Sequence, residues 1–132
     1  MIDARVQAGE FDPGRQLARL GELKTAAVAA FVGRVEAAED VVGIFVDHHA
    51  VLARRQLARI AGEAEARWPL AGIVLIHRHG RLEPGARVLF AGVAASDVAA
   101  AEAACAWLVA QTRARAPFWR KDLLADGGGR WR

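Results

Sequence analysis

The sequence is poor in cysteine, which excludes an internal disulfide, and in lysine, which leaves few amines for chemistry. Cys105 is the only cysteine among 132 residues, so no disulfide can form within the chain, which suits a reducing cytoplasm. Lys24 and Lys121 are the only lysines, so nearly all of the positive charge is carried by arginine. The net charge of +3 permits an anionic ligand but falls short of the basic surface expected of a protein that binds nucleic acid.

Long apolar runs and common catalytic motifs are also missing. No apolar stretch is long enough to span a membrane, and residues 1–5 do not lead into the hydrophobic core of a signal peptide, so we expect a soluble, cytoplasmic chain. The sequence has no G-x-S-x-G, Walker A or G-x-G-x-x-G motif. Residues 127–129 are glycines, but no helix follows them to bind a phosphate at its N-terminus.

The composition, 54% hydrophobic and 25% charged, is that of one globular domain with its own core. We therefore predict a single domain over residues 1–132, with a flexible glycine-rich tail from about residue 123. The order of predicted elements is strand, helix, two strands, helix, two strands, helix. This order favours an α+β fold with helices packed on mainly antiparallel sheets. Two of the helices are long, and the third is short and N-terminal.

Hydrophobic periodicity and turn residues give the boundaries of these elements. Strands are predicted over residues 5–11, 25–35, 41–47, 73–77 and 87–93, and helices over residues 13–21, 51–68 and 96–114. Residues 25–35 fit a buried strand or a helix equally by periodicity, and the nearby Gly21 and Gly33 favour the strand. Asp12 before Pro13 is a typical helix start, and Ser96 is the predicted N-cap of the last helix.

The histidines and the cysteine are weak candidates for chemistry. His77 and His79 would share one face of a strand, but nothing supplies a third metal ligand at a recognisable spacing. His48 and His49 are adjacent and so point to opposite faces. Cys105 has alanines and a tryptophan around it, with no charge to lower its thiol pKa, and is predicted to be a core residue. We expect no metal and no cofactor.

The segment R-A-R-A-P-F-W-R-K, residues 113–121, carries four cations around a proline and two aromatics. Pro117 disfavours helix at the residue before it, so the last helix should end here and continue as an extended segment. Phe118 and Trp119 are predicted to anchor that segment, because both are costly to leave in water. The cations would then form a pocket for a phosphorylated small molecule, or they are simply the basic end of a helix.

Arg34 is the remaining candidate, because it follows Gly33 at the end of a predicted buried strand. From there its side chain can reach a ligand across the edge of the sheet. The spacing alone therefore predicts one anion site made by Arg34, Arg113, Arg120 and Lys121, and nothing finer.

Four segments taken together resemble the large subunit of molybdopterin synthase, the MoaE family. They are F-V-G-R-V (31–35), A-E-A-R-W-P-L (64–70), I-H-R-H-G-R-L-E-P-G (76–85) and R-A-P-F-W-R-K (115–121). Each motif is weak alone, but they occur in the family's order from about Phe31 to Lys121. The resemblance implies an α/β hammerhead fold and a homodimer with one small subunit docked on each end.

The resemblance also implies a reaction. The ubiquitin-like small subunit brings a C-terminal Gly-Gly thiocarboxylate into a pocket of the large subunit. Two sulfurs then pass in turn to cyclic pyranopterin monophosphate, which becomes molybdopterin. The resemblance assigns catalysis to Arg113, Arg120 and Lys121, and substrate binding to four further arginines, Arg34, Arg78, Arg115 and Arg130.

The chain departs from the family at chemically important positions. The family has lysines where this chain has Arg113 and Arg120, a His-Arg pair where it has Asp97 and Val98, and a basic residue where it has Glu36. The loop over residues 36–40 is also shorter than the family's. Asp97 and Glu36 are expected to place negative charge where a phosphate should bind.

Arginine binds phosphate well, but it does not deprotonate near neutral pH and so cannot act as a base or an amine nucleophile. Lys121 is the nearest amine, yet residues 120 and 121 of an extended strand point to opposite faces. Two interpretations remain. The chain is a divergent working synthase subunit, or it is a non-catalytic paralogue that binds the pterin or the small subunit.

Overall fold

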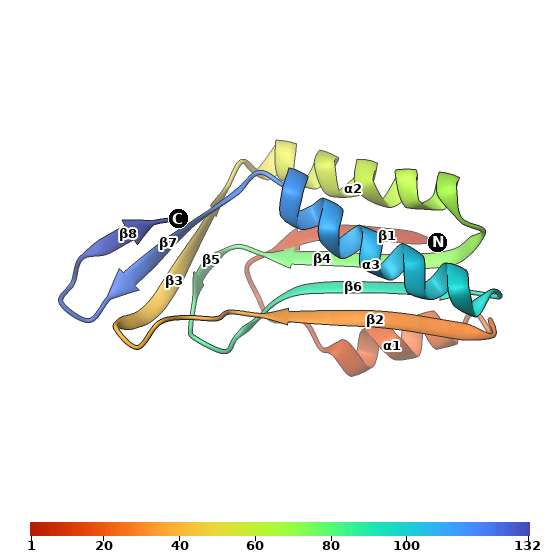
Figure 1. Cartoon of the computed structure of the whole chain (residues 1–132), viewed down its shortest axis with the longest axis horizontal. Helices are drawn as coiled ribbons and strands as arrows, with labels where there is room; N and C mark the ends of the chain where they lie inside the picture. The colour runs from red at the N-terminus through yellow and green to blue at the C-terminus, as the bar shows by residue number, and fades with distance from the viewer.

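The structure is a computed structural model that describes residues 1–132 and contains two four-stranded sheets. The larger sheet has the strand order β1-β4-β6-β2, and its central strands β4 and β6 are antiparallel (Figure 1). Edge strand β1 is parallel to β4, whereas edge strand β2 is antiparallel to β6. The strand bounds are β1 Ile2–Gln7, β2 Ala27–Arg34, β4 Leu70–Arg78 and β6 Arg87–Ala95.

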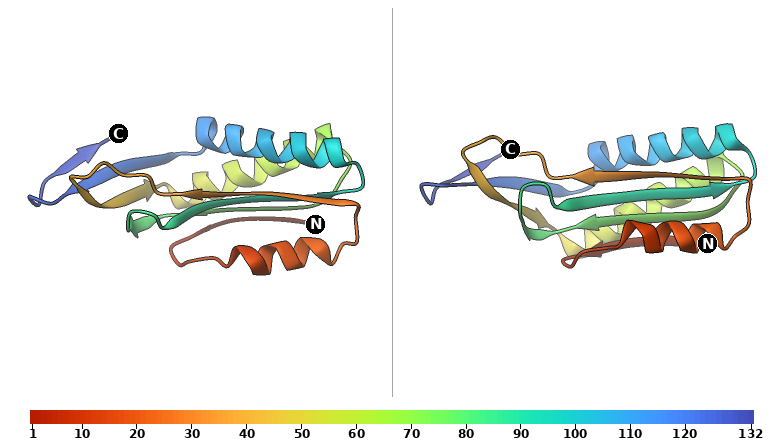
Figure 2. Two further views of the ribbon diagram at one scale, coloured as in Figure 1. Left: turned by 60° about the horizontal axis from the view of Figure 1, so that its bottom comes forward. Right: turned by 90° about the horizontal axis from the view of Figure 1, so that it is seen from below.

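Helices cover both faces of the larger sheet. α2 (Ala50–Arg67) and α3 (Val98–Arg115) lie side by side on one face, and α1 (Pro13–Gly21) lies on the other (Figure 2). Alternate residues of β4 pack into two hydrophobic cores, one on each face of the sheet. Ile73 and Leu75 lie in the core under α2 and α3. Val74 and Ile76 lie in the core under α1. The all-apolar run of β4 is thus explained by burial on both faces. None of the three helices combines the length and apolarity that a membrane span needs.

The smaller sheet extends beyond one end of the larger one (Figure 1). Its strands are all antiparallel, in the order β5-β3-β7-β8, with bounds β3 Val41–His48, β5 Gly80–Leu82, β7 Phe118–Leu124 and β8 Gly129–Trp131. The chain passes between the sheets from β4 to β5, through His79, and from α3 to β7, through Ala116 and Pro117. The cavity of the candidate functional site lies beside these two crossings.

The α+β class, the mainly antiparallel sheets, and the two long and one short helices are confirmed. α1 begins as predicted, with Asp12 accepting hydrogen bonds from the backbone N–H groups of Gly14 and Arg15. α3 also ends as predicted, because Ala116 before Pro117 has an extended backbone. The N-cap of α3 was predicted wrongly: Asp97, not Ser96, accepts from the backbone N–H of Ala99, at 3.0 Å.

The first strand differs from the prediction. It is Ile2–Gln7 rather than residues 5–11, because it pairs in register with β4, a partner distant in sequence, from Ile2 opposite Ile73. The tail from about residue 123 includes the end of β7 and strand β8, which form a short hairpin paired from Lys121 opposite Trp131. Arg130 and Arg132 of this hairpin also pair with Asp122.

Candidate functional site

A cavity of about 350 Å³ lies between the two sheets at the C-terminal end of α3. Its walls combine apolar side chains with three arginines, one histidine and one threonine. The lining residues are Arg34, Val35, Ile44, Val46, His77, Val88, Thr112, Arg113, Ala116, Phe118, Trp119 and Arg120. The volume is within the range of small-molecule sites, and the polar groups are few and differ in chemistry.

Arg34 reaches the cavity from the end of β2, where the pairing with β6 shifts register between Gly33 and Arg34. Its Nε donates a hydrogen bond to the backbone oxygen of Gly85 at 2.7 Å. Gly85 stands in a turn after Pro84 with a φ of 84°, a value that favours glycine, and the turn is closed by a bond from Ala86 N–H to the Glu83 oxygen at 3.0 Å. The turn thus holds Arg34 in place.

Arg113 comes from the last turn of α3, and its guanidinium carbon lies 5.5 Å from the centre of the Phe31 ring. Arg120 comes from β7, and its Nε donates to Oδ1 of Asp122 at 3.0 Å, while its terminal nitrogen donates to the backbone oxygen of Glu36. Each of the arginines is therefore held by a different partner. Each also keeps further N–H donors for a ligand.

The carboxylate that orients Arg120 is almost completely buried. Asp122 is 1% exposed and is surrounded by Arg120 at 3.0 Å, Arg130 at 3.5 Å and Arg132 at 3.7 Å. A buried carboxylate paired with several guanidiniums holds their positions more firmly than a surface pair does. The sequence analysis missed Asp122, although its spacing of two from Arg120 in an extended segment places both on the same face.

A second, outer hollow of about 610 Å³ shares the three arginines with the cavity. Besides Arg34, Arg113 and Arg120, it is lined by Phe31, Val32, Gly33 and Glu36. The arginines therefore stand at the boundary between an outer groove and an inner, mostly apolar cavity. Convergent guanidiniums at such a boundary form a site for a phosphate or another multivalent oxyanion.

His77 is held rigidly on the inner wall. Its ring stacks on Phe118 at 3.7 Å between centroids, and its Nδ1 lies 2.7 Å from the backbone oxygen of Arg78. Burial lowers the pKa of His77 to about 4, so the ring is neutral at pH 7. In the neutral ring Nδ1 must carry the proton to bond to a carbonyl, which leaves Nε2 as an acceptor.

Two of the other histidines stack on each other, and His49 caps α2 by accepting a hydrogen bond from the backbone N–H of Leu52 at 3.3 Å. His48 and His79 are stacked at 3.9 Å between centroids, which joins β3 to the crossing between β4 and β5. Desolvation lowers the pKa of His79, and the neighbouring His48 lowers it further. The structure contains no group of three or more His, Cys, Asp or Glu side chains that could hold a metal ion. Cys105 lies on the buried face of α3, and burial raises the pKa of its thiol.

Six arginines and one lysine were predicted for the site, and three of these seven residues line the cavity: Arg34, Arg113 and Arg120. Lys121 does not, because it lies on the opposite face of β7 with its Nζ 5.6 Å from the centre of the Trp131 ring. The alternation of residues 120 and 121 predicted for an extended strand is confirmed, and no register slip brings the amine into the cavity.

The remaining arginines are held elsewhere. Arg78 is 8% exposed and donates to the backbone oxygens of Ala8 and Arg87, so it fastens the loop after β1 to the large sheet. Arg115 pairs with Glu63 of α2 at 2.6 Å. This contact also lowers the pKa of Glu63. Arg130 pairs with Asp40 and Asp122.

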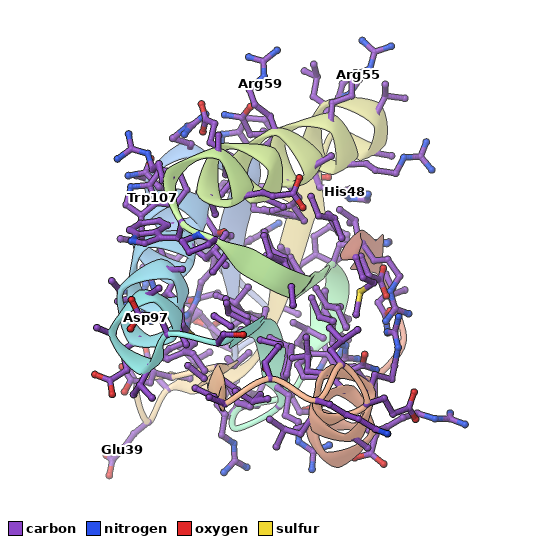
Figure 3. All side chains as sticks on the ribbon, turned by 90° about the vertical axis from the view of Figure 1, so that its right-hand side faces the viewer. Glu39, His48, Arg55, Arg59, Asp97 and Trp107 are labelled. Carbon is purple, nitrogen blue, oxygen red and sulfur yellow. The ribbon has the colours of Figure 1, made fainter.

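Three further expectations are resolved by the structure. Phe118 anchors the extended segment as predicted, but Trp119 does not, since it is 52% exposed beside the cavity. Glu36 lies at the site as expected, on the wall of the outer groove. Asp97 does not, because it caps the opposite end of α3, which faces the viewer in Figure 3.

Comparison with known proteins gives one consistent result. The family model described as "MoaE protein" matches residues 6–115. The molybdopterin synthase catalytic subunit of Pseudomonas aeruginosa is 41% identical over 96% of this chain and 87% of its own length.

Solved structures agree with the sequence comparison. The MoaE protein from Burkholderia ambifaria is 33% identical, with a TM-score of 0.85 over 99% of this chain and 88% of its own. A complex of subunits 1 and 2 of the molybdopterin-converting factor from Helicobacter pylori contains a chain that is 18% identical. It has a TM-score of 0.76 over 98% of this chain and 88% of its own, which shows a common fold.

Proposed function

This chain belongs to the MoaE family, the large subunits of molybdopterin synthase in molybdenum cofactor biosynthesis, and on that premise we propose that its cavity binds the phosphorylated pterin precursor. The observation that carries the proposal is the convergence of Arg34, Arg113 and Arg120, from three different elements, at the mouth of one cavity. The precursor, cyclic pyranopterin monophosphate, joins a flat heterocycle to a phosphate. The arginines suit the phosphate, and the apolar inner walls suit the heterocycle.

The sulfur donor in this proposal is the C-terminal Gly-Gly thiocarboxylate of a ubiquitin-like small subunit. A solved complex of the two subunits of the Helicobacter pylori factor shares this fold, which supports a small-subunit partner. A glycine tail is narrow enough to enter through the outer groove beside Phe31 and Gly33. Its carboxylate-like end would then meet the same guanidiniums that hold the phosphate.

The chain's own residues explain part of the chemistry. Sulfur transfer converts a thiocarboxylate into a carboxylate whose new oxygen comes from water, so charge develops on sulfur and oxygen and protons must move. Arg113 and Arg120 can neutralise the developing charge. Neither can take a proton, because a guanidinium stays protonated.

One observation favours a second candidate function. The two positions at which the family carries lysine are Arg113 and Arg120, and no lysine lines the cavity. A subunit that binds the pterin or the small subunit without turnover would need only the charges that remain. In either case we propose a cytoplasmic homodimer, as the family resemblance implies.

The test is in vitro conversion of the precursor by the purified chain with a thiocarboxylated small subunit. Conversion supports the synthase function, and binding without conversion supports the second candidate. Arg113→Ala and Arg120→Ala should each weaken binding of the precursor by about 10- to 100-fold, the effect of losing a charged hydrogen bond. Arg59→Ala, on the outer side of α2, is the matched control (Figure 3). If both cavity variants bind as the parent does, the site lies elsewhere.

A further inference from the structure

We propose that His77 and Thr112 form a hydrogen-bond acceptor end of the inner cavity, which orients a ligand heterocycle through its N–H groups while the arginines hold its phosphate. The proposal rests on the proposed function and adds specificity-determining residues to it. Both residues line the cavity, and neither is charged at neutral pH. The sequence did not predict a binding role for either of them.

The two ends of the site differ in position. Arg34, Arg113 and Arg120 line both the outer groove and the inner cavity, whereas His77 and Thr112 line only the inner cavity. A ligand whose phosphate reaches the arginines from the groove therefore places its other end against these two residues. The site therefore offers donors where the groove and the cavity meet, and acceptors that belong to the cavity alone.

The two ends also differ in chemistry. A guanidinium has five N–H donors and no acceptor, so the arginines can bind only acceptor groups of a ligand. His77 uses Nδ1 on the Arg78 backbone oxygen, and no hydrogen bond within the chain occupies Nε2. Its pKa of about 4 keeps the ring neutral, so Nε2 is a permanent acceptor at physiological pH. The stacking on Phe118 fixes the direction of that acceptor.

Thr112 adds an independent observation. Its side chain is 2% exposed, and its hydroxyl has no hydrogen-bond partner anywhere in the chain. A buried hydroxyl without a partner costs stability, and native proteins rarely leave one unless another molecule satisfies it. Thr112 lies on the cavity wall directly before Arg113, so a ligand held by Arg113 is within reach of it.

These observations select the class of ligand. A heterocycle with ring N–H or amino groups matches the acceptors, and a phosphate matches the donors. A reduced pterin phosphate has both. A sugar phosphate or inorganic phosphate would satisfy the arginines but would leave the inner wall without a matched partner.

The experiment compares two probes, cyclic pyranopterin monophosphate and inorganic phosphate, by calorimetric or NMR titration. His77→Phe keeps the aromatic stack but removes both ring nitrogens, including the Nδ1 contact to the Arg78 backbone oxygen. Thr112→Val keeps the side-chain shape and removes the hydroxyl. Each variant should bind the pterin phosphate about 3- to 10-fold more weakly, the effect of one neutral hydrogen bond, and should bind inorganic phosphate as the parent does. His77→Gln restores an acceptor close to the position of Nε2 and should recover part of the affinity.

Arg113→Ala is the control that should weaken both probes. The inference is overturned if His77→Phe and Thr112→Val bind the pterin phosphate as tightly as the parent, or if they weaken both probes equally. If the parent binds inorganic phosphate but not the pterin phosphate, the proposed function fails as well. That result is distinct from the first two, because it appears in the parent before any variant is made.

Discussion

At the scale of single residues, the exchange of lysine for arginine separates binding from proton transfer. Arg113 and Arg120 preserve positive charge at the cavity, and Arg120 gains a bond to Asp122 through its Nε that a lysine could not make in the same way. A lysine amine can be deprotonated when its pKa is lowered, and a guanidinium cannot. The same two residues therefore suit an anion site and are poor candidates for acid–base chemistry.

Restoring the amines tests this separation. The double substitution Arg113→Lys and Arg120→Lys should raise the rate of precursor conversion, by up to about two to four orders of magnitude, because a positioned acid or base contributes that much. Binding of the precursor should change little, since the positive charges stay. Rates are measured in single-turnover reactions with the thiocarboxylated small subunit. A parent that converts as fast as this variant would show that arginine charge alone suffices.

His77 gives a second residue-scale prediction, on stability. Unfolded, its pKa is near 6.5, whereas in the folded chain it is about 4, so between these values the unfolded state binds more protons. The free energy of unfolding should therefore fall as the pH is lowered from 7 towards 4. Urea unfolding at several pH values measures it. In His77→Phe the dependence should be weaker, with the remainder due to His79 and, towards pH 4, to Glu63, whose pKa values are lowered too. An unchanged slope would contradict the assignment.

At the scale of elements, α3 connects the two ends of the molecule. Its last turn supplies Thr112 and Arg113 to the cavity, and its first turn is capped by Asp97, about 24 Å from Arg113 along the axis at a rise of 1.5 Å per residue. The Asp97 carboxylate also complements the positive end of the helix dipole. Within one chain, then, the aspartate at the family's His-Arg position is a structural cap and not part of the anion site.

Asp97→Ala should lower the free energy of unfolding by about 1 kcal/mol, the usual cost of losing an N-cap. Asp97→Asn keeps an oxygen acceptor and should cost little. Asp97→His, which restores the family residue, should also destabilise the chain. Thermal or urea unfolding measures all three, and equal stability of the alanine variant and the parent would exclude the capping role.

At the scale of the whole molecule, the site depends on the junction between two sheets. The larger sheet with its three helices carries Arg34 and Arg113, and the smaller sheet carries Arg120. Stacked rings of His77 on Phe118 and of His48 on His79 bridge the two sheets. The junction therefore sets the distance between the arginines.

The edge strand β2 supports the proposed dimer. It pairs with β6 on one side only, and its Val28 and Val32 side chains are exposed. We expect light scattering at micromolar concentration to give the mass of a dimer, because family resemblance and this exposed apolar edge both favour self-association. Val32→Lys should shift the mass towards the monomer if β2 contributes to the interface. A monomeric parent would count heavily against the dimer.

Features that depend on neighbouring residues along the chain could be predicted from the sequence alone. The spacing of apolar residues predicted the two long helices, and Pro117 predicted the end of α3. The alternation of side chains along an extended strand predicted that Lys121 and Arg120 lie on opposite faces. The four motifs, which occur in the order typical of the MoaE family, predicted the family. Periodicity and local sterics act over a few residues, so one sequence suffices to read them.

Contacts between residues that are distant in sequence follow from the three-dimensional packing and could not be predicted. Arg34 and Arg120 line one cavity although many residues separate them in the sequence. Asp122 forms ion pairs with three arginines. His77 bonds to a backbone oxygen through Nδ1, which leaves its Nε2 as the free acceptor. Pairing with β4, about 71 residues away in the sequence, also sets the bounds of the N-terminal strand. Such contacts depend on how sheets pack and pair, which the local pattern of any one segment does not specify.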